Sequence, residues 1–367
     1  MERILVINPG STSTKISVFE DRENILTESV HHDAPELGAF KTVNDQVPMR
    51  KQVTLDILKR HGLDITDITV IAARGGNQYP VEAGVYKVDD RLYADTRDEK
   101  GGSDHPAKLG TMIAYEFTKE YGIPAYMVDP TNVDEMKDVA RITGIKGVYR
   151  NSQLHALNHR AVAFTYAKEV GKSYEDLRLV VAHIDGGITI AAHENGKIAD
   201  VNVGSGGDGA FAPSRIGSTP VLQIINLIEN GTSIDELKRL CSRQGGLASH
   251  FGTNDADKIL AMIDSGDKYA KLVWDAMIYQ TAKYIGEMAV SLKGNVDAIL
   301  LTGGLVRFPQ IVDTIKDMCG FIAPIKAYPG EFEQEALAHS ILRVIEGKQE
   351  AKTYTGKPVW TEWDFVK

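Results

Sequence analysis

Asn8-Pro9-Gly10-Ser11-Thr12-Ser13-Thr14-Lys15 lies between two apolar runs, residues 4–7 and residues 16–19. This pattern predicts a strand, a tight polar turn and a second strand. A glycine followed by Ser and Thr residues offers backbone N–H groups and short hydroxyl donors, which a turn needs in order to hold phosphate. Turns of the same composition also close ordinary hairpins. The rest of the chain must therefore decide between a phosphate turn and a plain hairpin.

The size and composition of the chain predict a globular protein of two domains. At 367 residues, the chain exceeds the length at which a single core usually stops growing. It is 43% apolar and 25% charged, a composition that excludes a disordered chain. The net charge is −9 and the sequence has no long Lys/Arg cluster, so we expect no nucleic-acid partner.

The cysteines and the start of the chain predict a soluble, cytoplasmic protein. Cys241 and Cys319 are too few for a disulfide framework, and we expect both to be buried thiols in a reducing compartment. Residues 1–3 lead directly into a strand, without the apolar region of a signal peptide. No apolar run approaches the roughly 20 residues of a membrane span, so we expect no membrane partner.

The opening pattern occurs a second time after about 175 residues. The order is again a strand (residues 179–184), a glycine-containing turn (Asp185-Gly186-Gly187), a strand (residues 188–192), a hairpin turn (residues 194–197) and a strand (residues 198–203). Such a repeat predicts two similar halves, each with three antiparallel strands followed by βα units. The two halves would then present two phosphate-facing hairpins.

Two charged residues are predicted at the carboxyl ends of strands, where open α/β sheets bind ligands. Arg74, in Arg74-Gly75-Gly76, follows the apolar residues 68–72, and Asp129 follows residues 125–128. Arg74 could also belong to a surface turn. Asp129 could hold a metal or orient a nucleophile, or it could cap a turn, which is the commoner role of Asp-Pro.

A helix predicted over residues 151–170 carries His155 and His159, four residues apart and so on one face. This spacing would permit a metal clip, but no third ligand is evident, and we favour a single functional histidine. An earlier helix, ending at Tyr121, is expected to begin near Asp104 or His105.

The last third of the chain contains three further candidates. Thr302-Gly303-Gly304 follows a strand predicted over residues 296–301 and precedes a helix, so a nucleotide could approach its backbone closely, although a tight βα turn has the same pattern. Arg215 lies in a glycine-rich segment, and Pro220 is expected at the first position of the next helix. Glu333 and Glu335 lie in the first turns of a helix predicted over residues 331–345, where acids also favour the helix dipole.

Taken together, these motifs resemble the acetokinase family of the sugar kinase/Hsp70/actin superfamily. The opening resembles the butyrate kinases of that family, because Pro-Gly-Ser-Thr-Ser stands where acetate kinases have Cys-Gly-Ser-Ser-Ser. The resemblance implies an α/β fold of two duplicated ribonuclease H-like domains around a central nucleotide cleft. The first domain would comprise residues 1–128 completed by residues 336–367, and the second, residues 129–335, would carry most nucleotide contacts.

The resemblance also implies an activity: ATP-dependent, magnesium-requiring, reversible phosphorylation of a short-chain carboxylic acid by a homo-oligomer. Arg74 and Arg215 would hold the carboxylate and the phosphoryl group. His155 would hydrogen-bond the transition state, and Asp129 would lie near the reacting centre. For the magnesium site we favour Asn8 and Glu335, the latter ahead of Glu333. The phosphate and nucleotide contacts would come from Asn8, Ser11, Ser13, Lys15, His183, Asp185, Gly186, Gly187, Gly303 and Gly304.

Two departures from the family pattern bear on the substrate. Acetate kinases have His-Gly-Gly where this chain has Arg74-Gly75-Gly76, with their arginine a few residues earlier, so Arg74 would replace that arginine from a shifted position. Leu154 replaces the Phe that precedes the transition-state histidine, which would leave room for butyrate or a branched C4–C5 acid. The alternatives are a kinase of a sugar hydroxyl with Asp129 as base, and a nucleotide-gated module that is not an enzyme.

Overall fold

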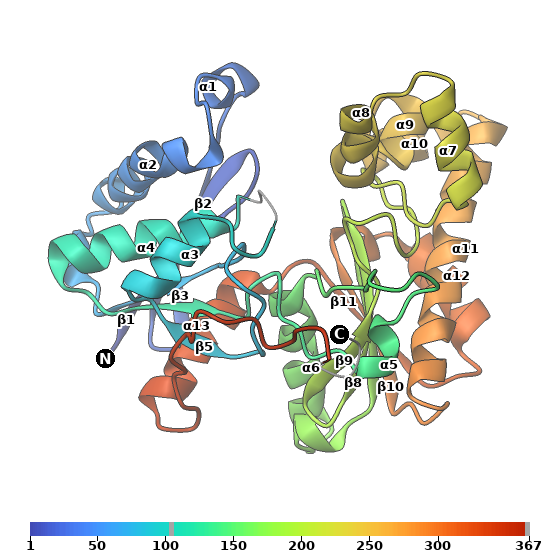
Figure 1. Cartoon of the computed structure of the whole chain (residues 1–367). Coiled ribbons are helices and arrows are strands. Elements are labelled where there is room, and N and C mark those ends of the chain that lie inside the picture. The colour runs from blue at the N-terminus through green and yellow to red at the C-terminus, as the bar shows by residue number, and fades with distance from the viewer. Residues whose placement is uncertain (103–105, 364–367) are drawn as a thin grey trace. The chain divides into compact units, whose positions relative to one another are not determined.

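The computed structural model describes residues 1–102 and 106–363, and it divides the chain into two compact units. The first unit comprises Met1–Asp134 with Phe332–Lys367, and the second comprises Glu135–Glu331 (Figure 1). The sequence placed the two boundaries after residues 128 and 335. Asp104 and His105, expected at the start of a helix, lie outside the described residues.

The first unit is built on a sheet of six strands in the order β3-β2-β1-β4-β6-β5. β1, β2 and β3 are antiparallel, β4 and β6 are parallel to β1, and β5 is antiparallel to β6. The strands are β1 Arg3–Pro9, β2 Ser13–Glu20, β3 Glu23–His31, β4 Val70–Ala73, β5 Val85–Lys87 and β6 Ala125–Val128. The helices are α1 Ala34–Gly38, α2 Val47–Arg60, α3 Asp90–Arg97, α4 Lys108–Tyr121 and α13 Glu333–Ile345.

The second unit repeats this topology in a sheet of five strands, β11-β10-β7-β8-β9. β7, β8 and β9 are antiparallel, and β10 and β11 are parallel to β7. The strands are β7 Leu179–Ile184, β8 Ile188–Glu194, β9 Lys197–Val201, β10 Ala298–Gly303 and β11 Ile325–Pro329. The helices are α5 Asp138–Arg141, α6 Ala156–Glu169, α7 Val221–Glu229, α8 Ile234–Arg239, α9 Leu247–Phe251, α10 Ala256–Asp264, α11 Lys268–Ser291 and α12 Pro309–Cys319.

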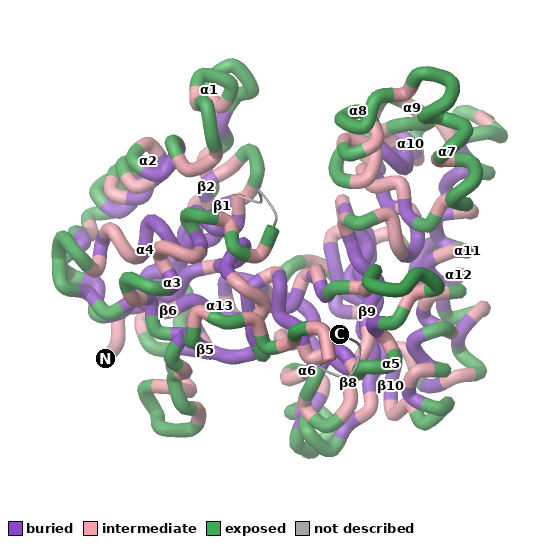
Figure 2. The backbone as a smooth tube through the Cα atoms, in the orientation of Figure 1, coloured by how far each residue is buried: buried purple, intermediate pink, exposed green. Residues whose placement is uncertain are grey.

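The duplication expected from the sequence is therefore confirmed, including the order and direction of five strands in each sheet. The match extends to an irregularity, because the register shifts between Val18 and Phe19 in β2 and between Ala192 and His193 in β8. The central strands form the cores: every residue of β7 and β10 is buried. Purple segments run through the interior of both units in Figure 2. Continuous apolar runs such as residues 179–182 are typical of strands covered on both faces.

Each unit is completed by a helix that follows the last parallel strand of the other unit. α6 comes after β6 of the first unit, yet it packs against β7 and β10 of the second. α13 comes after β11 of the second unit, yet it packs against β1 and β4 of the first. The N-termini of these two helices consequently bring residues distant in sequence to the ends of β1 and β7.

Four local predictions from the sequence were wrong in detail. α6 begins at Ala156 rather than at residue 151, because His155 has non-helical backbone angles and the carbonyl of Gln153 accepts from Gly204 N. Pro220 is the N-cap residue of α7, with φ −54° and ψ 128°, and the helix begins one residue later at Val221. The strand after α12, which the apolar pattern predicts over residues 322–327, is shifted to Ile325–Pro329. Between β10 and α12, a 3₁₀ helix, Gly304–Arg307, replaces a direct turn into the helix.

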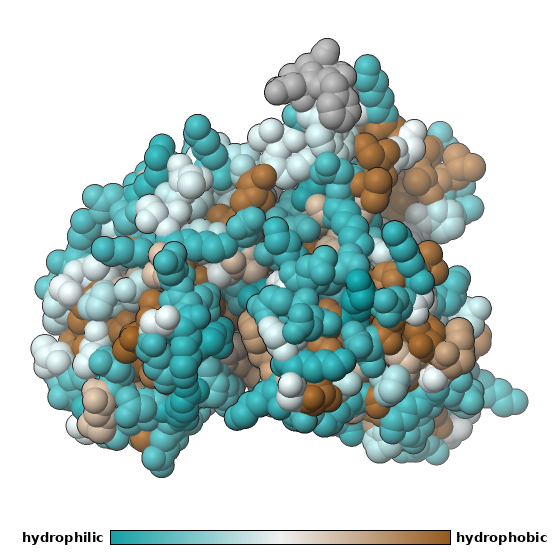
Figure 3. Space-filling view, turned by 90° about the horizontal axis from the view of Figure 1, so that it is seen from below, coloured by the Kyte–Doolittle hydropathy of each residue, from teal (hydrophilic) through white to brown (hydrophobic). Residues whose placement is uncertain are grey.

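Most of the surface in view in Figure 3 is hydrophilic, but one exposed helix, α7, is apolar. The face in Figure 3 is largely hydrophilic, with brown patches among the charged side chains. α7 has no buried residue, and it exposes the apolar side chains of Val221, Leu222, Ile225 and Ile228. Within the described residues, no helix has both the length and the apolar character to span a membrane. Of the two free thiols, Cys319 is buried as expected but Cys241 is only half-buried.

Candidate active site

The turn of residues 8–15 has the predicted form of strand, turn and strand. Gly10 N donates to Ser13 O over 2.9 Å and closes the turn. A Cβ atom at Gly10 would lie 3.0 Å from Ser13 Oγ, so glycine suits the close approach of these two residues. Asn8 is buried, Ser11 is exposed, and Ser13 and Lys15 are half-buried. The turn thus offers polar groups to a ligand on its open side, and their contact with phosphate stays a prediction.

A fully buried arginine supports this turn from behind. Arg50 of α2 donates from Nη1 to the carbonyls of Gly10 (3.1 Å) and Ser13 (2.5 Å), and from Nη2 to the carbonyl of Ser11 (3.2 Å). Its Nε donates to Gln46 Oε1 over 3.1 Å. Burial lowers the pKa of Arg50 to about 10, so the side chain keeps its positive charge at neutral pH. The turn therefore has a fixed cation against its carbonyl side.

Asn8, Arg74 and Glu333 meet at the ends of β1 and β4 and the start of α13. Asn8 Nδ2 donates to Glu333 Oε2 over 2.8 Å. Arg74 Nη1 donates both to the same Oε2, at 3.0 Å, and to Asn8 Oδ1, at 3.2 Å. Two side-chain oxygens thus surround one cationic nitrogen. Such an oxygen pair also fits magnesium, which prefers carboxylate and amide oxygens.

The structure brings Glu333, rather than the favoured Glu335, to Asn8. Glu333 is the first residue of α13 and is buried, whereas Glu335 is partly exposed. Successive helical residues are about 100° apart, so the two side chains leave the helix in nearly opposite directions. We therefore take Glu333 as the candidate metal ligand in place of Glu335.

Asp129 lies at the end of β6 in an unusual backbone conformation. Its φ is 35°, a region that costs energy for a residue with a side chain. The side chain is buried, and its Oδ1 accepts from Gly84 N over 2.7 Å. This contact fixes the Asp129 carboxylate within the first unit. Part of its role is therefore structural, and a place near the reacting centre stays a prediction.

The second glycine turn is tied to the end of β10 by an aspartate. Asp185 Oδ1 accepts from Gly186 N over 2.7 Å, and Oδ2 accepts from Gly304 N over 2.6 Å. A Cβ atom at Gly303, where φ is 101°, would lie 2.4 Å from Ile184 O, so only glycine allows this close approach. The structure thus brings Asp185, Gly186, Gly303 and Gly304 together, as nucleotide contacts would require.

Arg215 lies directly against the same turn. A Cβ atom at Gly187 would lie 2.2 Å from Arg215 Nη1, so the guanidinium group takes the space that a side chain would fill. Nη1 donates to Gly204 O over 2.6 Å, and Nε has no hydrogen-bond acceptor among the described residues. Burial lowers the pKa of Arg215, and within the described chain no carboxylate forms an ion pair with it. A largely buried cation without a carboxylate partner is suited to an anionic ligand.

His155 and His159 do not form a metal clip. His155 Nδ1 and His159 Nε2 each lie 2.9 Å from Thr189 Oγ1, so the two rings share one hydroxyl group. The ring of His155 also stacks on His183, with centroids 3.9 Å apart. His183 Nδ1 in turn lies 2.9 Å from Asn158 Nδ2. The predicted residues His155 and His183 are therefore in direct contact.

A further group of three residues could hold a cation in the second unit. His183, Asp185 and Glu331 each offer one ligand atom, and these atoms all lie within 4.8 Å of one another. His183 and Asp185 were expected to contact phosphate, whereas Glu331 had no predicted role. The predicted phosphate turn therefore carries negative charge of its own.

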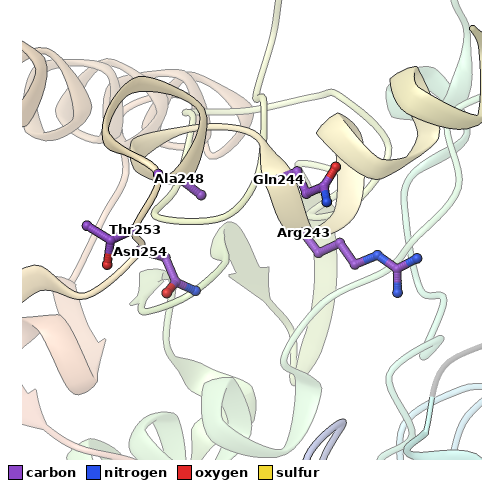
Figure 4. Close-up of a pocket in the computed structure, with 6 residues that line it drawn as sticks. Arg243, Gln244, Ala248, Thr253 and Asn254 are labelled. Atoms are coloured by element: carbon purple, nitrogen blue, oxygen red, sulfur yellow. The ribbon is translucent and has the colours of Figure 1, made fainter. Parts of the chain in front are cut away.

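A separate polar pocket of about 470 Å³ lies among the helices that follow β9. In Figure 4, Arg243 and Gln244 lie on one side, and Thr253 and Asn254 lie across from them. Gly252 and Ala248 complete the lining. None of the residues predicted from the sequence is among these six.

Sequence reasoning missed several residues that support the candidate site. Thr189 lies three residues before the register shift of β8, as Lys15 does before that of β2, so the repeat could have indicated it. Asn158 lies in the first turn of α6, close in sequence to His155, which precedes this helix. Arg50 carried no local signal, because its partners in the turn lie 36 to 40 positions earlier in the sequence.

Known proteins match this chain in sequence pattern and in fold. A model of the acetokinase family matches residues 141–316. Acetate kinase from Porphyromonas gingivalis superposes with a TM-score of 0.75 at 19% identity, covering 94% of this chain and 100% of that chain. A propionate kinase from Francisella tularensis subsp. tularensis superposes with a TM-score of 0.73 at 17% identity, covering 93% of this chain and 99% of that chain. Lmo2764 from Listeria monocytogenes, a putative N-acetylmannosamine kinase, superposes with a TM-score of 0.52 at 15% identity, covering 94% of this chain and 99% of that chain.

At these identities the structural matches establish the fold. It is the fold of the acetate and propionate kinases, with two similar domains that each contain a mixed sheet. Residues 141–316 include His155, the second glycine turn, Arg215 and the Gly303-Gly304 turn, and so cover most of the site in the second unit. The chain thus has the acetate kinase fold and, over residues 141–316, the sequence pattern of the acetokinase family.

Proposed function

We propose that this protein transfers the γ-phosphoryl group of ATP to a short-chain carboxylic acid, and that butyrate or a branched C4–C5 acid is preferred. The product would be the acyl phosphate, and the reaction would be reversible. The observation that carries the proposal is Arg215, a largely buried cation that lies against a glycine turn and has no carboxylate partner among the described residues. Within the proposal, Arg215 and Arg74 offset the repulsion between two anionic reactants.

Each unit has its own candidate ligands for the nucleotide or its magnesium ion. Asn8 and Glu333 present oxygens around the cationic Arg74 Nη1, a donor set that fits Mg²⁺. Magnesium would neutralise phosphate charge when bound. Ser11, Ser13 and Lys15 would contact phosphate from one turn, and Gly186, Gly187, Gly303 and Gly304 would allow close approach from the other. Together with His155, these groups would stabilise the charge on the phosphoryl group in flight.

The preference for a longer acid rests on Leu154, which is buried beside His155. Two additional methylene groups contribute about 1.6 kcal/mol when fully buried, which corresponds to a preference of roughly fifteenfold. Leucine leaves more room than phenylalanine, so a C4 or C5 chain can be accommodated where a larger side chain would exclude it. The physical basis of the preference is therefore the volume beside His155.

Acyl hydroxamate trapping tests the proposal. The full-length protein is incubated with MgATP, hydroxylamine and either acetate, propionate, butyrate, isobutyrate or isovalerate, and ADP release is followed in parallel with a panel of sugars. We expect hydroxamate with the acids and the highest kcat/KM for a C4 or C5 acid. A higher value for acetate contradicts the chain-length proposal. Sugar-dependent ADP release without hydroxamate favours a sugar kinase, and no turnover of either class favours a nucleotide-gated module.

We further propose that the protein self-associates and works in the cytoplasm. α7 exposes Val221, Leu222 and Ile225, and its only charged residue is Glu229, so two copies of this helix can pair without strong charge repulsion. The two free cysteines suit a reducing compartment. Light scattering of the protein and of Leu222→Glu/Ile225→Glu tests the association, which we expect the double substitution to weaken. If the unsubstituted protein is already a monomer, the proposal that it self-associates is contradicted.

A further inference from the structure

A chain of hydrogen bonds leads from Tyr174 to His155 in the second unit. Tyr174 Oη lies 2.8 Å from His193 Nδ1, and His193 Nε2 lies 3.4 Å from His159 Nδ1. Thr189 Oγ1 then lies 2.9 Å from both His159 Nε2 and His155 Nδ1. The first four members are all buried. The chain therefore connects the half-buried His155 to a phenol group in the protein interior.

The two inner histidines are neutral at physiological pH. Burial lowers the pKa of His193 well below its ordinary value and that of His159 to about 3. A neutral imidazole carries one N–H, so each ring donates at one nitrogen and accepts at the other. The Thr189 hydroxyl likewise has a single hydrogen. Among the described residues, only His155 and His159 form hydrogen bonds with this hydroxyl, so its hydrogen goes to one of them and its oxygen accepts from the other. All members consequently donate in the same direction along the chain.

Two polarities satisfy this condition, and they differ in energy at the Tyr174 end. In one, Tyr174 donates to His193 and Thr189 donates to His155. In the other, every donor is reversed, and Tyr174 accepts from His193. The inner links use the same kinds of donor and acceptor in both cases. A phenol, with a pKa of about 10, is a stronger donor than a neutral imidazole N–H, and an imidazole nitrogen is a better acceptor than a phenolic oxygen. The polarity that begins at Tyr174 is therefore favoured.

We propose that this chain holds His155 as the neutral tautomer protonated at Nε2, with Thr189 and Tyr174 as positioning residues. Because Nδ1 accepts from Thr189, the single proton of neutral His155 resides on Nε2. This inference rests on the proposed function, in which His155 donates a hydrogen bond to the phosphoryl group. The opposite tautomer would offer that anionic group a lone pair in place of a proton. The direction of the chain thus decides whether His155 can stabilise the transition state.

Nitrogen NMR tests the tautomer directly, without reference to activity. The full-length protein is labelled with ¹⁵N-histidine, and long-range ¹H–¹⁵N spectra at pH 8 distinguish protonation at Nδ1 from protonation at Nε2. The His155 signals are assigned by their loss in His155→Asn. We expect the Nε2–H form in the unsubstituted protein, the same form in Thr189→Ser, and a mixture of both tautomers in Thr189→Val and Tyr174→Phe. The Nδ1–H form in the unsubstituted protein, or an unchanged tautomer in both of the last two variants, would overturn the proposal.

Measurements of kcat and KM show whether Thr189 positions His155 or only stabilises the fold. We expect Thr189→Val to lower kcat roughly tenfold or more, which is the loss of one well-placed hydrogen bond, with little change in KM. Thr189→Ser should restore kcat. Thr281→Val is the matched control, because Thr281 is a buried threonine of α11 in the same unit and its hydroxyl donates to Met277 O within its own helix. An equal loss of kcat in this control contradicts the positioning role. If the unsubstituted protein turns over no acid at all, the proposed function fails while the NMR result still decides the tautomer.

Discussion

Arg74 Nη1 and Glu333 Oε2 form a partly buried ion pair of 3.0 Å, although they are 259 positions apart in sequence. The pair exists because α13 returns from the end of the chain to pack against β1 and β4. Asn8 bonds to both partners, so three residues from three distant segments make one polar cluster. In the proposed reaction, Asn8 and Glu333 would hold magnesium, and Arg74 would hold the carboxylate of the acceptor.

Glu333→Gln should raise the magnesium concentration needed for half-maximal activity. The substitution keeps the size of the side chain but removes the negative charge, and one charged ligand is worth on the order of 1.5–3 kcal/mol, or roughly tenfold or more in affinity. Activity is measured over a titration of Mg²⁺ at fixed ATP. Glu335→Gln is the matched control two residues along the same helix, and we expect its titration to be unchanged. A shift in Glu335→Gln alone would restore the assignment favoured from the sequence.

Arg50→Lys should weaken nucleotide binding more than carboxylate binding. Lysine keeps the charge but cannot donate in a fixed fork to three carbonyl groups of the turn, so the residues facing phosphate lose their support. We expect KM for ATP to rise roughly tenfold and KM for the acid to change little. The two values are measured by varying each substrate at saturating levels of the other.

Arg60→Lys is the control for this prediction, because Arg60 lies on the same helix but pairs with Glu28 at the surface. Circular dichroism at the assay temperature must show that Arg50→Lys is folded. If both KM values rise equally, or if Arg60→Lys has the same effect, Arg50 does not act through the turn.

Arg215→Lys should lower kcat by at least two orders of magnitude. The guanidinium group lies against Gly187 and donates to Gly204 O, so its position is fixed, and a shorter ammonium group would leave the turn. Single-turnover measurement with saturating ATP and acid isolates the chemical step. Arg178→Lys serves as the control, since Arg178 pairs with Glu194 away from the turn. Near-normal turnover in Arg215→Lys would remove the observation on which the proposed function depends.

The strands and turns could be predicted from sequence because their signals are local. Runs such as residues 4–7, with a glycine turn after them, specify a strand and its end, and the repeat of that pattern specified the duplication. Glu333 could not be matched to Asn8 in this way, since 325 residues lie between them and only the return of α13 joins them. Arg50 was missed for the same reason. The sequence indicated which residues could bind phosphate, but not which distant side chains hold them in place.

Leu154→Phe should shift acyl-chain preference toward acetate. Leu154 is buried beside His155, and a larger side chain there reduces the volume for the acyl tail. We expect the ratio of kcat/KM for butyrate to that for acetate to fall by roughly tenfold, chiefly through loss for butyrate. Hydroxamate formation with the two acids measures the ratio. Leu157→Phe, another buried leucine three residues further along, is the control for general overpacking. A proportional loss for both acids in Leu154→Phe would mean that Leu154 does not contact the acyl tail.

The buried histidines should make the protein less stable in mild acid. The pKa of His159 is lowered to about 3 in the folded state, whereas an unfolded histidine titrates near 6.5. Between these values the unfolded chain binds one proton more than the folded chain, so stability falls as pH drops from about 6.5. The loss is about 1.4 kcal/mol per pH unit for one such group. We expect the free energy of unfolding, measured by urea titration at pH 7.5 and pH 5.0, to fall less in His159→Gln than in the unsubstituted protein. His61→Gln, at an exposed histidine paired with Glu28, is the control, and equal pH dependence in His159→Gln and the unsubstituted protein would show that His159 is not held neutral.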